Sequence, residues 1–121
     1  MSFFYPTSAE FIEKFGCESY TDEDGLQIST FNNINMKLVF SVSNMQNSIS
    51  VKIYQDEVKT FSIYDEGAMR VTIDSNHVII EYLNYKNLYA KKITIIEVYP
   101  LFKIEHSTLL DKSIRDLNES F

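Results

Sequence analysis

The stretch Ile34-Asn-Met-Lys-Leu-Val-Phe-Ser-Val-Ser43 carries an apolar side chain at every second position. Successive side chains of a β-strand point to opposite faces of the sheet, so this alternation is typical of a strand with one buried face. The pattern recurs to about residue 106, and polar turns of two to four residues join most of the segments. We therefore expect a continuous antiparallel meander that leaves little sequence for catalytic loops.

Segments with this strand pattern number about seven or eight, and runs rich in Asn, Asp, Ser and Gly separate most of them. Those residue types tolerate the backbone angles of tight hairpins. The stretches 77–80 and 93–96 are nearly continuously apolar, which is usual for strands covered on both faces. The predicted strands are 26–31, 34–43, 48–55, 58–64, 69–74, 77–83, 91–99 and 101–106.

A short helix is predicted over residues 8–16. Thr7 and Glu10 have the spacing of a capping box, and Gly16 suits the left-handed position that ends many helices. Three apolar residues are expected on one face of this helix: Phe11, Ile12 and Phe15.

A second helix is predicted over residues 108–119, with its apolar stripe packed on the sheet. The polar, acidic residues 17–25 predict a loop, and Pro100 predicts an edge or a bend. The fold class is thus α+β in a single domain, 1–121: a curved antiparallel β-meander with a short N-terminal helix and a C-terminal helix. The stripe of the second helix consists of Leu110, Ile114, Leu117 and Phe121.

The composition describes an acidic globular protein of 121 residues with a formal charge of −6. Acidic balance argues against nucleic acid and anionic membranes as direct ligands, and it permits a basic protein partner. Neither a secretory signal nor an apolar run near the ~20 residues of a membrane span is evident in the sequence. The single cysteine, Cys17, is compatible with a reducing cytoplasm.

Residues that could perform catalysis or bind metal are few in this sequence. Glu105 and His106 are neighbours in a predicted strand, so their side chains point to opposite faces. The motif Asp22-x-Asp24-Gly25 is a fragment of a calcium loop without its later ligands. We therefore predict no catalytic residue, no metal site and no cofactor, and we do not expect an enzyme.

Alternate turns of a meander lie at opposite ends of the sheet, which sorts the charged turns into two groups. One end gathers five carboxylates, hereafter the acidic end, beside the connection that holds Tyr85 and Tyr89. Tyrosine next to carboxylates suits recognition of a cationic protein. The alternative is a solvated sheet end that Lys86, Lys91 and Lys92 partly neutralise. The acidic end consists of Asp22, Glu23, Asp24, Asp65 and Glu66.

The layout resembles that of small bacterial immunity proteins, the inhibitors encoded beside polymorphic toxins such as those of contact-dependent growth inhibition. The resemblance rests on Phe11-Ile-Glu-Lys-Phe-Gly16, on Asp22-Glu-Asp-Gly25, on the meander and on Glu105-His-Ser-Thr-Leu-Leu110. It implies a cytoplasmic protein that binds the C-terminal domain of a toxin, often a nuclease with a basic surface. Binding would block the active site or the substrate-binding surface of that toxin.

Two other classes of function stay open from the sequence. One is an adaptor or chaperone-like binding module for a secreted effector. The other is a small ligand carrier or an enzyme built around a cavity in the sheet, which would need a roomy apolar interior or a cleft where His106 or a carboxylate pair converges. Oligomeric state does not follow from the pattern.

Overall fold

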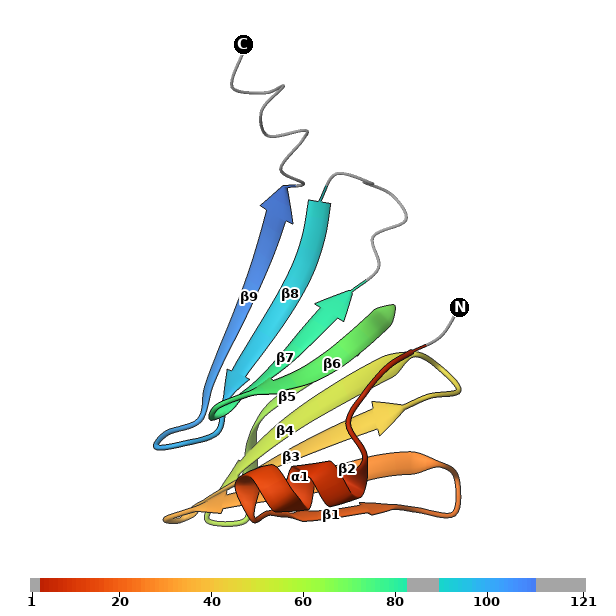
Figure 1. The fold of residues 1–121 in the computed structure, drawn as a ribbon. Coiled ribbons are helices and arrows are strands. Elements are labelled where there is room, and N and C mark those ends of the chain that lie inside the picture. The colour runs from red at the N-terminus through yellow and green to blue at the C-terminus, as the bar shows by residue number, and fades with distance from the viewer. Residues whose placement is uncertain (1–2, 83–89, 111–121) are drawn as a thin grey trace.

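The computed structural model describes residues 3–82 and 90–110, which form one α-helix and nine strands (Figure 1). The broad prediction of an α+β fold with antiparallel sheets is confirmed. Among these residues no helix is long and apolar enough to cross a membrane. The elements are α1 (Ser8–Phe15), β1 (Glu18–Thr21), β2 (Leu26–Asn33), β3 (Met36–Ser43), β4 (Ser48–Gln55), β5 (Val58–Glu66), β6 (Ala68–Asp74), β7 (His77–Tyr82), β8 (Ala90–Glu97) and β9 (Lys103–Leu110).

The strands form two sheets, whereas the sequence predicted one continuous meander. Strands β1 to β5 make a five-stranded sheet in sequence order, and β6 to β9 make a four-stranded sheet in sequence order. The chain passes from one sheet to the other at Gly67, whose φ of 83° is a left-handed conformation that glycine adopts at little cost. Figure 1 shows the four-stranded sheet inclined to the five-stranded one, and β5 ends a sheet instead of pairing with β6.

The N-terminal segment lies along the free edge of β6. The backbone N–H of Phe4 donates to the carbonyl of Met69 at 3.1 Å, and the N–H of Val71 donates to the carbonyl of Phe4 at 2.7 Å. These bonds occupy backbone groups that an open edge strand would present to other chains.

Each sheet contributes one face to a common core. On β3, Leu38, Phe40 and Val42 are buried, and their alternation defines the inner face that the sequence pattern predicted. Helix α1 covers the β1–β2 side of the sheet and adds Phe11 and Phe15. The buried residues contributed by β4, β7 and β8 include Ile49, Val51, Val78, Ile80 and Ile96.

The ends of α1 are as the sequence predicts, but one of its apolar residues is not buried. The Thr7 hydroxyl accepts from the N–H of Glu10 at 3.2 Å, and Gly16 has a φ of 65° at the C-terminal end. Phe11 and Phe15 are buried, whereas Ile12 is 47% exposed. Phe11 and Phe15 are four residues apart and share the helix face that packs on the sheet, and Ile12 lies at the side of that face.

Several predicted boundaries are wrong. Part of the predicted loop 17–25 is strand β1, which pairs with β2 and leaves a turn near Asp22. The last hairpin bends around Pro100, so β8 ends at Glu97 and β9 starts at Lys103. Residues 108–110, predicted as the start of a helix, continue β9; the rest of that prediction, 111–119, lies outside the described residues.

Cys17 has a structural environment just after α1. Its thiol donates to the carbonyl of Phe11 at 3.5 Å, and the side chain packs against the core. Burial raises the pKa of the Cys17 thiol, which lowers its thiolate fraction and hence its reactivity.

Candidate functional site

The turns are sorted between the two ends of the sheets in the way that a meander requires. At one end, Asp22 and Asp24 share a hollow with Met45, and the N–H of Ala68 donates to the carbonyl of Asn47 at 2.9 Å. At the other end, the N–H of Asp56 donates to the carbonyl of Asn35 at 2.9 Å, and the Asn33 side chain donates to the carbonyl of Pro100 at 2.7 Å. The turn that carries Asp22, Glu23 and Asp24 thus lies beside the β3–β4 turn.

The five carboxylates of the acidic end do not form one cluster. Asp22, Glu23 and Asp24 lie in the turn between β1 and β2, whereas Asp65 and Glu66 end β5 at the far edge of the same sheet. Strands β2 and β5 are separated by three strand-to-strand spacings, a distance of about 15 Å across the sheet. The two predicted tyrosines of this end, Tyr85 and Tyr89, lie outside the described residues.

Asp65 points toward the core side instead of outward, because β5 continues through Glu66 and keeps its alternation. Its carboxylate accepts from the hydroxyl of Tyr82 at 3.2 Å and from Nζ of Lys92 at 3.4 Å. Lys92 also lies 4.7 Å from the centre of the Tyr82 ring. Lys92, predicted only to neutralise the acidic end as a whole, therefore pairs specifically with Asp65.

A chain of hydrogen bonds extends this pair across the four-stranded sheet. The Thr94 hydroxyl donates to Tyr82 Oη at 3.2 Å and lies 2.7 Å from Nδ1 of His106. Thr94 is fully buried and Tyr82 is 4% exposed. The atoms that join His106 to Asp65 are therefore closed to a substrate, and the chain ties β5 of one sheet to β7, β8 and β9 of the other.

Tyr82 provides a test of this network at alkaline pH. Burial, together with the charge and hydrogen bond of Asp65, raises the pKa of Tyr82 above its usual value despite the opposing Thr94 bond. The folded protein therefore holds the phenol proton more tightly than the unfolded chain does. The stabilisation is complete below about pH 10 and is lost as the pH rises beyond it.

We expect the free energy of unfolding of the wild-type protein to fall more steeply than that of Tyr82→Phe between about pH 9 and pH 11. Urea titrations followed by circular dichroism at each pH measure both slopes. Parallel slopes would show that Tyr82 is not held in this buried network in solution.

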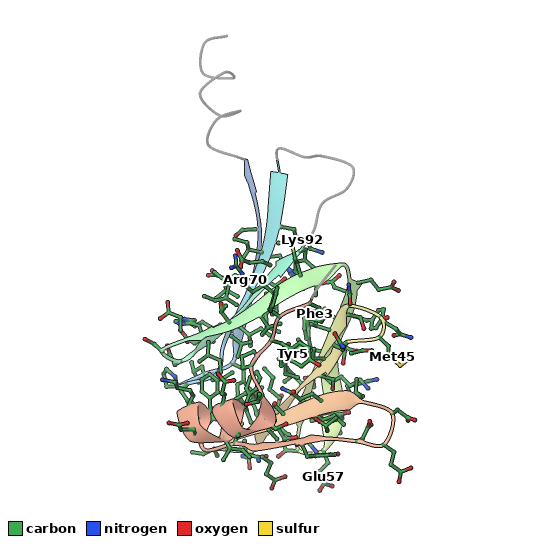
Figure 2. All side chains as sticks on the ribbon, turned by 45° about the vertical axis from the view of Figure 1, so that its right-hand side comes forward. Phe3, Tyr5, Met45, Glu57, Arg70 and Lys92 are labelled. Atoms are coloured by element: carbon green, nitrogen blue, oxygen red, sulfur yellow. The ribbon has the colours of Figure 1, made fainter. Side chains whose placement is uncertain are left out.

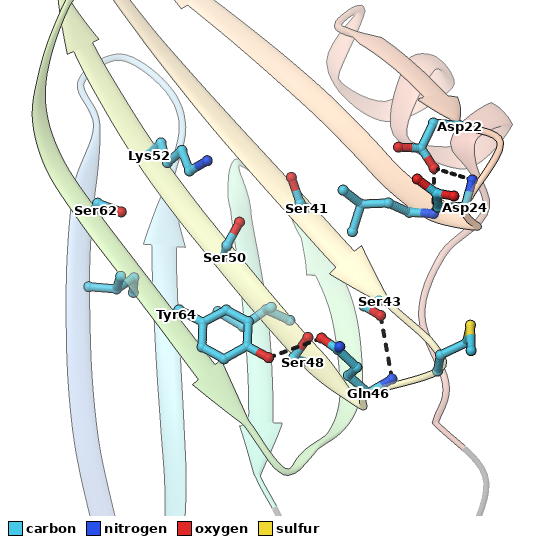
Figure 3. A pocket seen from close by; sticks show the side chains of 14 residues that line it. Asp22, Asp24, Ser41, Ser43, Gln46, Ser48, Ser50, Lys52, Ser62 and Tyr64 are labelled. Carbon is cyan, nitrogen blue, oxygen red and sulfur yellow. Dashed lines mark hydrogen bonds between the residues drawn. The ribbon is translucent and has the colours of Figure 1, made fainter.

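The outer face of the five-stranded sheet carries a groove that the sequence analysis did not identify. Because Leu38, Phe40 and Val42 face the core, Ser41 and Ser43 on the same strand face outward. This serine groove has a volume of about 540 Å³ and opens beside the β1–β2 and β3–β4 turns (Figure 3). Its lining includes five serines on the floor, Ser41, Ser43, Ser48, Ser50 and Ser62, with Asp22, Asp24, Met45, Gln46, Lys52 and Tyr64 around them.

Short side chains produce the hollow. Across the β3–β4 pair, Ser41 lies opposite Ser50 and Ser43 lies opposite Ser48. Four small residues in a square leave a depression between the longer side chains that surround them. A signal for it was present in the sequence, since serines alternate with apolar residues on both sides of the turn at 44–47.

The rim of the serine groove is partly ordered and partly free. The Tyr64 hydroxyl donates to Oε1 of Gln46 at 3.1 Å, which holds the ring over the β4–β5 side. Oδ1 of Asp22 accepts from the N–H groups of Asp24 and Leu26, both at 2.9 Å. Met45 is 89% exposed. It lies at the tip of the β3–β4 turn (Figure 2). The two bonds to Asp22 show that its carboxylate stabilises the turn between β1 and β2, the segment that resembles part of a calcium loop.

The two histidines contact different faces of the four-stranded sheet. Nε2 of His77 lies 3.4 Å from Oε1 of Glu97, beside Glu105, whereas His106 contacts Thr94 on the opposite face. Glu105 and His106 therefore point apart, as strand geometry predicts. Over residues 3–82 and 90–110, no group of three or more His, Cys, Asp or Glu side chains is placed to hold a metal ion.

Comparison of the sequence with protein-family models and with curated proteins found no match. Comparison of the fold with solved structures found a chain of the contact-dependent growth inhibition toxin–immunity protein complex from Klebsiella pneumoniae 342. The two chains superimpose with a TM-score of 0.72 at 17% identity, over 90% of this chain and 100% of the other. At that identity the likeness establishes a shared fold.

Proposed function

We propose that this chain is an immunity protein that neutralises a toxin domain by binding it in a stoichiometric complex. The observation that carries the proposal is the fold that 90% of this chain shares with the full length of a chain of a toxin–immunity protein complex. The resemblance of the sequence layout to immunity proteins points the same way.

Of the two roles in such a complex, the inhibitor suits this chain better. The formal charge of −6 disfavours contact with phosphate, which a nuclease must make, and favours contact with a basic partner. The buried positions of Thr94 and Tyr82 leave no open path between His106 and Asp65 for a reaction. We therefore assign no enzymatic activity to the chain.

The toxin is proposed to be a basic C-terminal domain. Among toxin activities, a nuclease fits an acidic inhibitor best, because a nuclease needs a basic surface to bind phosphate. Binding would take place in the cytoplasm of the producing cell. The proposed contact surface is the outer face of the five-stranded sheet with the turn Asp22–Glu23–Asp24, where exposed Met45 and Tyr64 offer apolar area beside carboxylates. Tyr85 and Tyr89 remain predicted contacts, and Asp65 would act by ordering the sheet end.

Co-expression with the toxin domain encoded next to this chain tests the function. We expect the pair to elute as one complex of equal stoichiometry in size-exclusion chromatography, with a dissociation constant of about 1 nM or lower. Cells that make both proteins should grow, whereas cells that make the toxin alone should stop growing.

A matched control uses a toxin domain from an unrelated system, against which this chain should give no protection. If the neighbouring toxin neither binds nor is neutralised while the chain is folded, the proposed function is wrong.

A further inference from the structure

The floor of the serine groove holds hydrogen-bonding groups that the described part of the chain does not use. Ser41 and Ser48 are 8% and 2% exposed, yet their hydroxyls bond to no described residue. Neither oxygen is sealed off, because both residues line the groove. These hydroxyls are open to the groove and have no protein partner in the described ranges, so they can bond to water or to a ligand there.

The rim adds negative charge that is fixed in place and open to a ligand. Two backbone N–H groups orient the carboxylate of Asp22, and they occupy one of its oxygens. Asp24 is exposed, and its carboxylate bonds to no other residue in the described ranges. The charged residues that line the groove are two carboxylates, Asp22 and Asp24, and one ammonium, Lys52. The groove therefore presents more acceptors than donors.

We infer that the serine groove receives an arginine side chain presented by a loop of the partner protein, an inference that rests on the proposed function. A guanidinium carries five donors in a planar fork and has no acceptor, which complements hydroxyl and carboxylate oxygens. It also stacks on aromatic rings, and the bond to Gln46 holds the ring of Tyr64 beside the groove. Lysine supplies a point charge without the fork or the stacking.

The size of the groove fits an arginine together with part of the loop that carries it. A volume of about 540 Å³ is within the range of about 300–1,000 Å³ that ligand pockets have. Ser50 lies opposite Tyr64 across the β4–β5 pair, so the hydroxyl floor and the aromatic ring are neighbours. One guanidinium could then contact both.

Chemical-shift mapping on the whole ¹⁵N-labelled chain tests the inference directly. The probes are capped tetra-arginine, tetralysine and tetraglutamate peptides. We expect tetra-arginine to shift the amide signals of Ser41, Ser48 and Ser50, and to bind about fivefold or more tightly than tetralysine. Shifts elsewhere, or equal shifts with lysine, would overturn the assignment to arginine in this groove.

The variant Ser41→Ala/Ser48→Ala removes both hydroxyls and leaves the small volumes in place. We expect it to weaken tetra-arginine and toxin binding by about tenfold, whereas the control Ser107→Ala on β9 should change neither by more than about twofold. The unligated spectrum reports folding. If the double variant is disordered, Asp24→Asn, exposed and outside the sheet, replaces it with the same expected loss.

The results separate this inference from the proposed function. Undiminished toxin binding by the double variant and by Asp24→Asn would overturn the groove as the arginine site while leaving the immunity role standing. Arginine shifts in the groove without any complex with the toxin would overturn the immunity role and keep the groove.

Discussion

Replacing Phe11 with alanine will lower the free energy of unfolding by about 3–5 kcal/mol, the usual cost of removing a fully buried phenylalanine ring. Phe11 has no exposed surface, and its ring centre lies 6.1 Å from that of Phe15 and 6.0 Å from that of Phe40. The substitution leaves a cavity between α1 and the five-stranded sheet. Domains of this size have a total stability of about 5–15 kcal/mol, so the loss would be a large fraction of it.

The next residue of the same helix provides the control. Ile12 is 47% exposed, and alanine is the better helix former, so Ile12→Ala should change the stability by less than about 1 kcal/mol. Urea titrations of both variants at neutral pH measure the difference. Similar small losses for both variants would mean that α1 does not pack on the sheet in solution.

The contrast between these two residues shows what the sequence could predict and what it could not. The capping box and Gly16 define the two ends of α1, because capping depends on residues close in sequence. Which residues of the helix become buried depends on the sheet that it meets. Phe11 and Phe15 face the rings of Phe40 and Phe31, and Ile12 faces away.

The same limit applies to the strands. Alternation shows that Leu38 and Phe40 share a face, and the structure buries both. Alternation does not show where a sheet ends. A chain that changes sheet at Gly67 therefore has the same sequence pattern as a chain that continues in one sheet. Alternation also leaves strand ends open: β5 continues through Glu66, and this extension turns Asp65 inward to Tyr82.

The candidate site depended on both kinds of information. The grouping of the turns by end followed from chain order alone, and the described residues group as expected. Prediction of the serine groove would require knowing which strands are neighbours and in which register they pair. The pairing of β3 with β4 brings four serines together: Ser41, Ser43, Ser48 and Ser50. The groove is the more specific feature, since charge at a turn is common, whereas a floor of open hydroxyls without protein partners depends on this particular strand pairing.

The second large effect concerns charge at the turn beside this groove. We expect Glu23→Lys/Asp24→Lys to slow association with the toxin about tenfold to a hundredfold at low salt, because opposite charges steer basic and acidic surfaces together. Both residues are exposed, and Asp22, whose carboxylate shapes the turn, stays intact. Stopped-flow or surface plasmon resonance measurements over a range of salt concentrations give the rate and its salt dependence.

The control for this prediction is Glu13→Lys/Asp74→Lys, which alters the formal charge of −6 by the same amount. Glu13 lies on α1 and Asp74 ends β6, away from the turn at residues 22–24, and both are exposed. Screening has a length of about 8 Å at physiological salt, so charges placed there should change the association rate by less than about threefold. Equal effects of the two variants would indicate that net charge alone governs association. An unchanged rate and salt dependence for Glu23→Lys/Asp24→Lys would place the interface on another surface, because a charged turn at the contact must alter both.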